Sequence, residues 1–340
     1  MSVKWPVSFL MLACMACNNS PTLTDEPLRL RIPQGFAPME IPADNQPTKL
    51  RVLLGRKLFY DVRLSAGQNV SCGTCHVASA AFTDGKKVNA GHSGEALDRN
   101  TPTIANMAWS PCFMMECGVP TLELQGLAPL HNSHEMATDM LPQLAILNED
   151  EALRDLARAA YQRDSIDPFV VTRALASFQR TLISADSRYD RHTAGLPNQL
   201  NDVELLGMQL FFSEKTNCSS CHSGVLFTDF GLYNIGLYAS DTDQGLMRKT
   251  HLEADHGKFK TPTLRNVELT APYMHDGSLN TLQDVVAFYN TGGQEADNKD
   301  DRIRPLNLTQ QEQAALVAFL NSLTDYNFVQ NAQFLPLENP

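Results

Sequence analysis

The chain has 340 residues, 43% of them hydrophobic and 19% charged, which is enough for about two domains with separate cores. This composition excludes a disordered, collagen-like or coiled-coil protein as the main architecture. The formal net charge of −11 argues against a nucleic-acid partner, because nucleic-acid-binding surfaces are basic.

The N-terminus resembles a bacterial export signal that ends in a lipidation site. A short apolar stretch over 7–16 is too short to cross a bilayer and fits a signal sequence. Small residues then precede a cysteine and polar residues follow it, so we expect a lipid on Cys17 or, alternatively, on Cys14. We predict a signal peptide and lipobox over 1–17 and a flexible segment over 18–41; a plain cleaved signal peptide is the alternative.

The most informative motif is Cys-x-x-Cys-His, which occurs at 72–76 and again at 218–222. It is the attachment motif of c-type haem, in which two thiols bond the haem vinyl groups and the histidine binds iron. The sequence therefore predicts two covalent haems, held by Cys72, Cys75 and His76 and by Cys218, Cys221 and His222. The alternative is tetrahedral zinc, which would need the two motifs to come together in one site.

Four blocks of sequence, the haem motif among them, occur twice in the same order, which indicates an internal duplication. A Leu-Leu-Gly block precedes each motif, and Phe-Thr-Asp and Thr-Pro-Thr blocks follow it. In the first half these three blocks lie at 53–60, 82–84 and 101–103, and in the second half they lie at 205–212, 227–229 and 261–263. Apolar residues elsewhere recur with the helical period, and strand patterns are scarce. We predict a mainly α protein with two tandem cytochrome c-like domains, each with one haem, over 42–195 and 196–340.

Further motifs accompany the duplication: Arg-Asn-Thr-Pro at 99–102, Leu-Glu-Leu-Gln at 122–125, His-Glu-Met at 134–136, Thr-Pro-Thr-Leu-Arg-Asn at 261–266 and Ala-Pro-Tyr-Met-His-Asp-Gly at 271–277. With the haem motifs, they resemble the bacterial dihaem cytochrome c peroxidase and MauG family. The resemblance implies a peroxidatic N-terminal domain that reduces peroxide and a C-terminal domain that passes electrons to it. It also places Arg265 at the cofactor.

The resemblance implies that three residues of the N-terminal domain act on peroxide. Glu135 matches the distal carboxylate, which can carry the proton that splitting H2O2 requires, and Gln125 matches the distal amide. His92 matches a removable sixth ligand that blocks the first haem until the second is reduced. Without the resemblance, Glu135 and Gln125 are ordinary polar residues and His92 is a loop histidine with no metal role.

The second haem is expected to keep both axial positions filled. The family position for its sixth ligand lies fourteen residues after His275 and is Tyr289 in this chain. Peroxidases of the family commonly carry Met there, and the MauG branch carries Tyr, whose phenolate favours higher iron oxidation states than a thioether does. Met274 is the alternative ligand, and a core aromatic of its helix is the alternative role for Tyr289.

The segment that the family places between the haems departs from its pattern. Ten residues before Gln125 the family has Trp, and this chain has Met115, a poor hole carrier beside indole. Trp109 lies six residues away and is a candidate to replace it in space. Cys112 and Cys117 flank the segment; an exported location permits a disulfide between them, and two free thiols are the alternative.

The resemblance further implies a calcium site between the domains, supplied by Asn100, Thr270 and Pro272 through oxygen atoms. The sequence thus favours a periplasmic dihaem peroxidase that reduces H2O2 to water with electrons from a cytochrome c or a cupredoxin. Two alternatives stay open: a MauG-like enzyme that oxidises residues of a partner protein, and a non-catalytic dihaem electron-transfer cytochrome. A lipid anchor and a homodimer also stay open.

Overall fold

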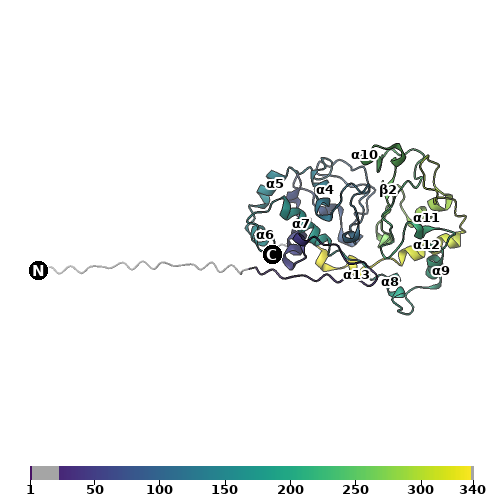
Figure 1. Ribbon diagram of the computed structural model, residues 1–340, viewed down its shortest axis with the longest axis horizontal. Coiled ribbons are helices and arrows are strands. Elements are labelled where there is room, and N and C mark those ends of the chain that lie inside the picture. Colours follow the sequence, from purple (N-terminus) through teal and green to yellow (C-terminus); the bar gives the residue numbers. More distant parts are fainter. Residues whose placement is uncertain (2–22, 338–340) are drawn as a thin grey trace.

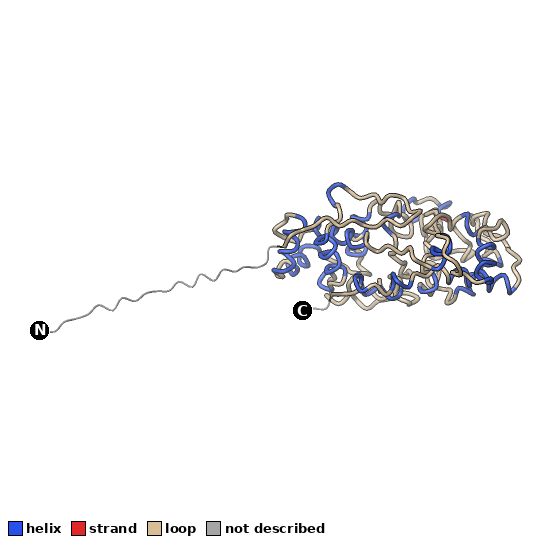
Figure 2. The backbone as a smooth tube through the Cα atoms, turned by 90° about the horizontal axis from the view of Figure 1, so that it is seen from below, coloured by secondary structure: helices blue, strands red, loops and turns tan. Residues whose placement is uncertain are grey.

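The computed structural model describes Met1 and residues 23–337, and these are mainly α-helical, as predicted (Figure 1). The predicted signal peptide, with Cys14 and Cys17, lies outside the described residues. Long loops connect the helices (Figure 2). The sheet in the described part is one antiparallel pair, β1 (Leu232–Tyr233) with β2 (Phe259–Lys260). Within the described residues, none of the helices has the length and apolar character needed to cross a membrane.

The helices of the first half are α1 (Lys49–Phe59), α2 (Cys72–Cys75), α3 (Leu122–Gln125), α4 (Leu127–His131), α5 (Met140–Leu147), α6 (Glu151–Tyr161), α7 (Pro168–Gln179) and α8 (Arg188–Thr193). Those of the second half are α9 (Asp202–Phe211), α10 (Met247–Thr250), α11 (Leu282–Thr291), α12 (Gln310–Asn321) and α13 (Tyr326–Val329). Short 3-10 helices such as η4 (Met107–Trp109) lie in the loops.

Local sequence signals explain where the longer helices begin. Thr281 and Thr309 open α11 and α12 as capping boxes: each hydroxyl accepts a bond from the backbone N–H three residues on. In return, the carboxylates at those positions, Asp284 and Glu312, accept a hydrogen bond from the backbone N–H of the cap residue. Pro168 is the first residue of α7, where its missing N–H costs nothing.

The hydrophobic core consists of two large clusters, which lie on either side of the predicted boundary near residue 195. The first gathers residues of α1, α6 and α7, and the second gathers residues of α9, α11 and α12. The packing also crosses the boundary: Phe328, Val329 and Phe334 pack into the first cluster, and Tyr189 packs against the second. In Figure 1 the yellow α13 accordingly lies beside the first half of the chain.

The duplicated Leu-Leu-Gly blocks form the same helix crossing in both halves. A Cβ atom on Gly55 of α1 would lie 1.9 Å from the carbonyl oxygen of Ala174 in α7. A Cβ atom on Gly207 of α9 would lie 1.9 Å from the carbonyl oxygen of Ala315 in α12. Both helix pairs cross so closely that only glycine fits, which explains why the glycine recurs in the repeat.

We expect Gly207→Ala to lower the free energy of unfolding by about 1–3 kcal/mol, because the added methyl group must push α9 away from α12. Gly118→Ala is the matched control, since a Cβ atom there meets nothing nearer than Glu116 Cγ at 3.9 Å. Urea unfolding followed by circular dichroism measures both variants. Equal midpoints for Gly207→Ala and the parent protein would contradict the expected crowding.

Candidate haem-binding and catalytic site

The histidines of the two Cys-x-x-Cys-His motifs are oriented in the same way. Nδ1 of His76 lies 2.9 Å from the carbonyl oxygen of Phe82, and Nδ1 of His222 lies 3.0 Å from that of Phe227. A carbonyl oxygen only accepts, so Nδ1 carries the proton and Nε2 keeps its lone pair. Burial lowers the pKa of both rings, which favours the neutral form. A neutral imidazole with a free Nε2 is the form that binds a metal.

The four motif cysteines lie beside their histidines, and none of them forms a disulfide with another described residue. Burial raises the pKa of Cys72 to about 12 and that of Cys75 to about 11, and it also raises the pKa values of Cys218 and Cys221. Cys72 packs against the first hydrophobic cluster and Cys218 against the second. No group of three or more His, Cys, Asp and Glu side chains in the described part of the chain could hold a metal, so the motifs do not meet as zinc would require.

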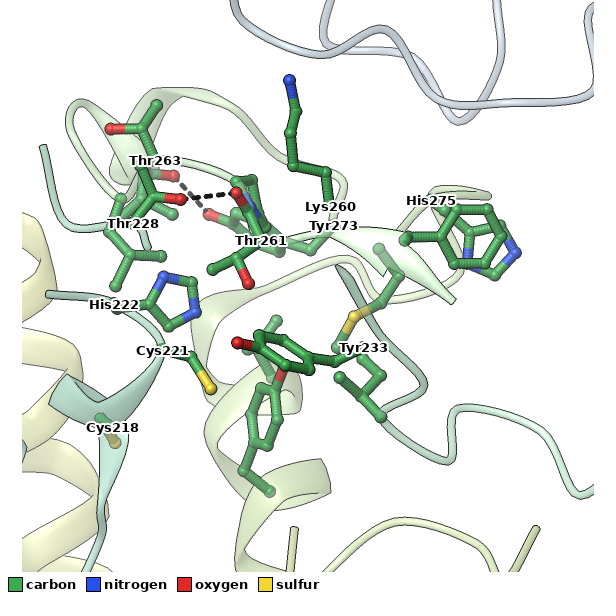
Figure 3. A pocket seen from close by; sticks show the side chains of 18 of the residues that line it. Cys218, Cys221, His222, Thr228, Tyr233, Lys260, Thr261, Thr263, Tyr273 and His275 are labelled. Carbon is green, nitrogen blue, oxygen red and sulfur yellow. Dashed lines mark hydrogen bonds between the residues drawn. The ribbon is translucent and has the colours of Figure 1, made fainter. Parts of the chain in front are cut away.

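A cavity of about 400 Å³ lies beside the second motif (Figure 3). Its lining is mostly apolar and includes Cys218, Cys221 and His222 of the second half, together with Met115 and the segment 101–103 of the first half. The cavity thus combines two thiols, a histidine prepared for metal binding and apolar walls. These residues fit a covalently attached haem.

Both candidate ligands of the second iron, Tyr289 and Met274, line this cavity. Tyr289 projects from α11 toward the motif: burial raises the pKa of its phenol, and the nearby sulfur atoms of Cys218 and Cys221 raise it further. A buried phenol keeps its proton in these surroundings, whereas a bound metal cation reverses that preference. The structure therefore places Tyr289 in the lining of the same cavity as Cys218, Cys221 and His222.

Glu135 lies in the turn between α4 and α5, close to the first motif. Its carboxylate is near enough to raise the pKa values of Cys72 and Cys75, and it accepts a hydrogen bond of 2.7 Å from Asn132 Nδ2. Burial raises the pKa of Glu135, although Asn132 and the charge of Arg99 oppose the rise. The carboxyl group therefore holds a proton to higher pH than an exposed glutamate does, which suits proton transfer.

The His92 loop is attached directly to the turn that carries Glu135. The backbone N–H of His92 donates to the Glu135 carbonyl oxygen at 2.8 Å. The chains approach closely because Gly91 has no side chain: a Cβ atom there would lie 1.7 Å from the His134 carbonyl oxygen. Gln125 ends α3, and α4 leads from it to the Glu135 turn. The backbones of His92 and Glu135 are therefore neighbours.

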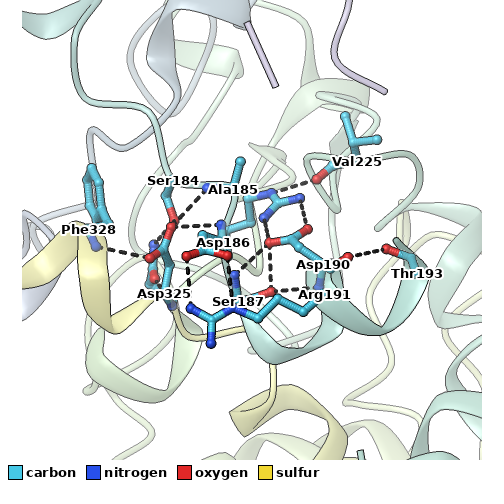
Figure 4. A network of polar contacts seen from close by, with 12 residues as sticks. Ser184, Ala185, Asp186, Ser187, Asp190, Arg191, Thr193, Val225, Asp325 and Phe328 are labelled. Carbon is cyan, nitrogen blue, oxygen red and sulfur yellow. Dashed lines mark hydrogen bonds and ion pairs between the residues drawn. The ribbon is translucent and has the colours of Figure 1, made fainter. Parts of the chain in front are cut away.

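Arg265 is placed away from the cavity. Its buried guanidinium forms two hydrogen bonds of 2.8 Å to the carboxylate of Asp190, and its Nε donates to the Val225 carbonyl oxygen at 2.6 Å. Figure 4 labels these two acceptor residues, Asp190 and Val225. Among the described residues, it is not one of those that line the cavity. In this geometry Arg265 joins α8 to the loop that follows the second motif.

The three residues expected to bind calcium, Asn100, Thr270 and Pro272, all line the same cavity. Asn100 links the two halves, because its backbone N–H donates to the His275 carbonyl oxygen at 2.8 Å. Its Nδ2 donates to two backbone carbonyl oxygens at 2.9 and 3.2 Å, which leaves Oδ1 as an acceptor. Oxygen donors of this kind fit Ca²⁺.

A disulfide joins Cys112 to Cys117, which is the first of the two alternatives that the sequence left open, and closes a loop that contains Met115. Met115 lines the cavity. Trp109 does not take its place: the indole packs edge-on against Phe36, with ring centroids 4.9 Å apart, and donates to a backbone carbonyl of the N-terminal segment at 2.8 Å. The part of the cavity wall where the family has Trp is therefore occupied by a thioether.

Sequence reasoning missed the ion pairs that hold the two halves together beside this loop. Arg99 forms hydrogen bonds of 2.6 and 3.0 Å to Asp243 and one of 2.8 Å to Glu116. Within the second half, Asp241 lies 3.4 Å from Nε2 of His275. Arg99 and Asp243 are 144 residues apart, and the only signal for the pair was the Arg-Asn-Thr-Pro motif that contains Arg99.

Comparison with known proteins agrees with this geometry. The sequence pattern of the family described as di-haem cytochrome c peroxidase matches residues 49–198. The methylamine utilization protein MauG of Methylophilus methylotrophus is 34% identical over 283 residues, which cover 83% of this chain and 84% of that protein. The cytochrome-c peroxidase IdrP1 of Denitromonas iodatirespirans is 33% identical over 328 residues, which cover 84% of this chain and 85% of that protein. The crystal structure of a MauG-like protein associated with microbial copper homeostasis matches with a TM-score of 0.86 and 34% identity, covering 91% of this chain and 99% of that one. The chain therefore belongs to the di-haem cytochrome c peroxidase and MauG family.

Proposed function

We propose that this chain is a periplasmic dihaem peroxidase that reduces H2O2 to water with electrons from a small redox protein such as cytochrome c or a cupredoxin. Residues 42–195 would form the peroxidatic domain and residues 196–340 the electron-transfer domain, each with one covalent haem. The observation that carries the proposal is the position of Glu135, a half-buried carboxyl group close to Cys72 and Cys75. An electron-transfer cytochrome has no need for such a proton carrier.

Each residue of the first site would have a separate role in the cleavage of peroxide. A bound haem supplies the iron at which the O–O bond is cleaved. Glu135 takes the proton from one peroxide oxygen and delivers it to the other, so that water leaves. Asn132 holds the carboxylate in place through its 2.7 Å hydrogen bond. Gln125 would orient peroxide or water with its amide.

His92 would control access to this site as a removable ligand of the first iron. We expect His92→Gly to increase the high-spin ferric signal in the electron paramagnetic resonance spectrum of the fully oxidised protein. Glycine keeps the backbone N–H that binds the Glu135 carbonyl oxygen, so the loop is expected to stay in place. An unchanged spectrum would remove His92 from the set of iron ligands.

A MauG-like activity, the oxidation of residues in a partner protein, is the second candidate function. Tyr289 favours it, because a phenolate ligand stabilises higher oxidation states of iron than a thioether does. Met115 opposes it, because a thioether replaces the indole expected between the haems. Non-catalytic electron transfer remains the third candidate, opposed by the Glu135 site.

Two further assignments complete the proposal. Ca²⁺ would bind between the domains through oxygen atoms of Asn100, Thr270 and Pro272, which line one cavity wall. A lipid on Cys17, or on Cys14, would anchor the exported protein to a membrane surface.

Two measurements on the full chain test the proposed function. A pyridine haemochrome assay is expected to give two haems per chain, and Cys72→Ser with Cys75→Ser is expected to give one. Steady-state assays with H2O2 and reduced cytochrome c are expected to show turnover. One haem or bound zinc in the parent protein would overturn the assignment, and two haems without turnover would favour the electron-transfer cytochrome.

A further inference from the structure

Lys260, the last residue of β2, connects the second half of the chain to the disulfide-closed segment 112–117 of the first half. Its backbone N–H donates to the carbonyl oxygen of Met115 at 2.7 Å. Its ammonium group donates to the carbonyl oxygen of Cys112 at 2.8 Å and to Ser110 Oγ at 3.3 Å. One residue thus holds three acceptors on the other side of the boundary.

The second half holds Lys260 in a defined position beside the second motif. Lys260 pairs with Leu232 across the β1–β2 sheet. On one side, the preceding Phe259 stacks on His275, with ring centroids 4.1 Å apart and an angle of 12° between the planes. On the other side, the backbone carbonyl of Thr261 accepts a hydrogen bond of 2.7 Å from Thr228 (Figure 3). The strand β2 therefore connects the cavity wall on the side of the second motif to the segment that contains Met115.

The Lys260 ammonium group brings a positive charge into this boundary. Its side chain extends away from Cys221 and His222 in Figure 3. Its contacts there are neutral acceptors, and among the described residues no carboxylate lies within ion-pair distance of it. Glu116 is the nearby carboxylate, and Arg99 binds it at 2.8 Å. Burial lowers the pKa of Lys260 to about 8, so the group is still mainly charged at pH 7.

We propose that Lys260 is a positioning residue that fixes Met115 and the segment 112–117 between the two haem sites and places a positive charge there. The charge favours the reduced state of the second haem, because Lys260 lines the cavity beside the second motif and a nearby cation stabilises the form with the additional electron. This role rests on the proposed dihaem function. The positioning of the segment does not depend on it.

Three variants of the full, haem-loaded protein distinguish the effect of Lys260 on the position of the segment 112–117 from the effect of its charge on the haem potentials. K260M removes the charge and both side-chain hydrogen bonds, while its backbone N–H can still bind Met115. K260Q removes the charge but keeps an amide that can donate to Cys112. K249M is the matched control, since Lys249 is an exposed lysine whose ammonium group donates at 2.8 Å to the carbonyl oxygen of Cys117, at the other end of the segment.

Hydrogen–deuterium exchange of residues 110–119 measures the position of the segment, and spectroelectrochemical titration measures the two haem potentials. We expect K260M to speed the exchange about tenfold or more, because hydrogen bonds to a charged group are lost. We expect the potential of the second haem to fall in K260M and K260Q, with slower exchange in K260Q than in K260M. We expect the potentials of K249M to equal those of the parent protein.

Unchanged exchange and potentials in K260M would overturn the proposal, as would an equal fall of the potentials in K249M. If K260M binds fewer than two haems, K260Q replaces it, and unchanged potentials in K260Q would overturn the charge assignment. A parent protein without two haems would instead overturn the proposed function. The exchange measurement would then still decide whether Lys260 positions the segment.

Discussion

Glu135→Gln is expected to lower peroxide turnover by at least about 10²-fold while leaving both haems attached, because it removes the proton carrier of the first site. Glutamine has nearly the same shape and can still accept the hydrogen bond from Asn132, so the turn between α4 and α5 is expected to persist. Steady-state assays with H2O2 and reduced cytochrome c measure the effect. The pyridine haemochrome assay shows that haem content is unchanged.

Glu95→Gln is the matched control for this prediction. Glu95 is exposed, and its carboxylate approaches only His134, at 4.0 Å. The same charge is therefore removed near the first motif without removing a half-buried proton carrier. Turnover of Glu135→Gln within a few-fold of the parent protein would reject the catalytic role of Glu135. An equal loss in both variants would show that the effect is due to charge alone.

Tyr289→Met is expected to raise the reduction potential of the second haem, because a thioether ligand favours ferrous iron and a phenolate favours ferric iron. The variant is expected to behave as a more conventional peroxidase. The parent protein is expected to retain oxidising equivalents after peroxide is added. Redox titration measures the potential, and stopped-flow spectroscopy measures how long the oxidised species lasts.

Two further variants show whether Tyr289 acts through its oxygen atom. Tyr289→Phe keeps the ring but removes the oxygen atom, so it is expected to change the spectrum of the second haem if the oxygen is a ligand. Met274→Leu tests the other candidate ligand on the cavity wall. An unchanged potential and spectrum in Tyr289→Met would make Tyr289 a core aromatic and Met274 the leading ligand.

The Met115→Trp variant restores the aromatic residue of the family pattern, and its oxidised species can be followed by the same stopped-flow spectroscopy. The oxidised species is expected to last longer in this variant than in the parent protein. Such a result would favour the MauG-like activity over simple peroxide reduction.

The sequence by itself determined the features that depend on covalent or local chemistry. Cys-x-x-Cys-His predicts haem attachment because both thiols and the histidine must lie within five residues. The Leu-Leu-Gly repeat corresponds to a helix crossing in which Gly55 and Gly207 meet backbone carbonyl oxygens directly. The capping boxes at Thr281 and Thr309 likewise depend on residues three positions apart.

Only the tertiary structure decided which distant side chains share a site. It brings Tyr289 near Cys218 and Cys221, whereas it pairs Arg265 with Asp190 and leaves it outside the cavity lining. Trp109 likewise packs against the N-terminal segment instead of replacing Met115. The same packing places Phe334, which is near the C-terminus, in the first hydrophobic cluster. The physical reason is that these contacts depend on how helices and long loops pack, and residue spacing along the chain carries no information about that packing.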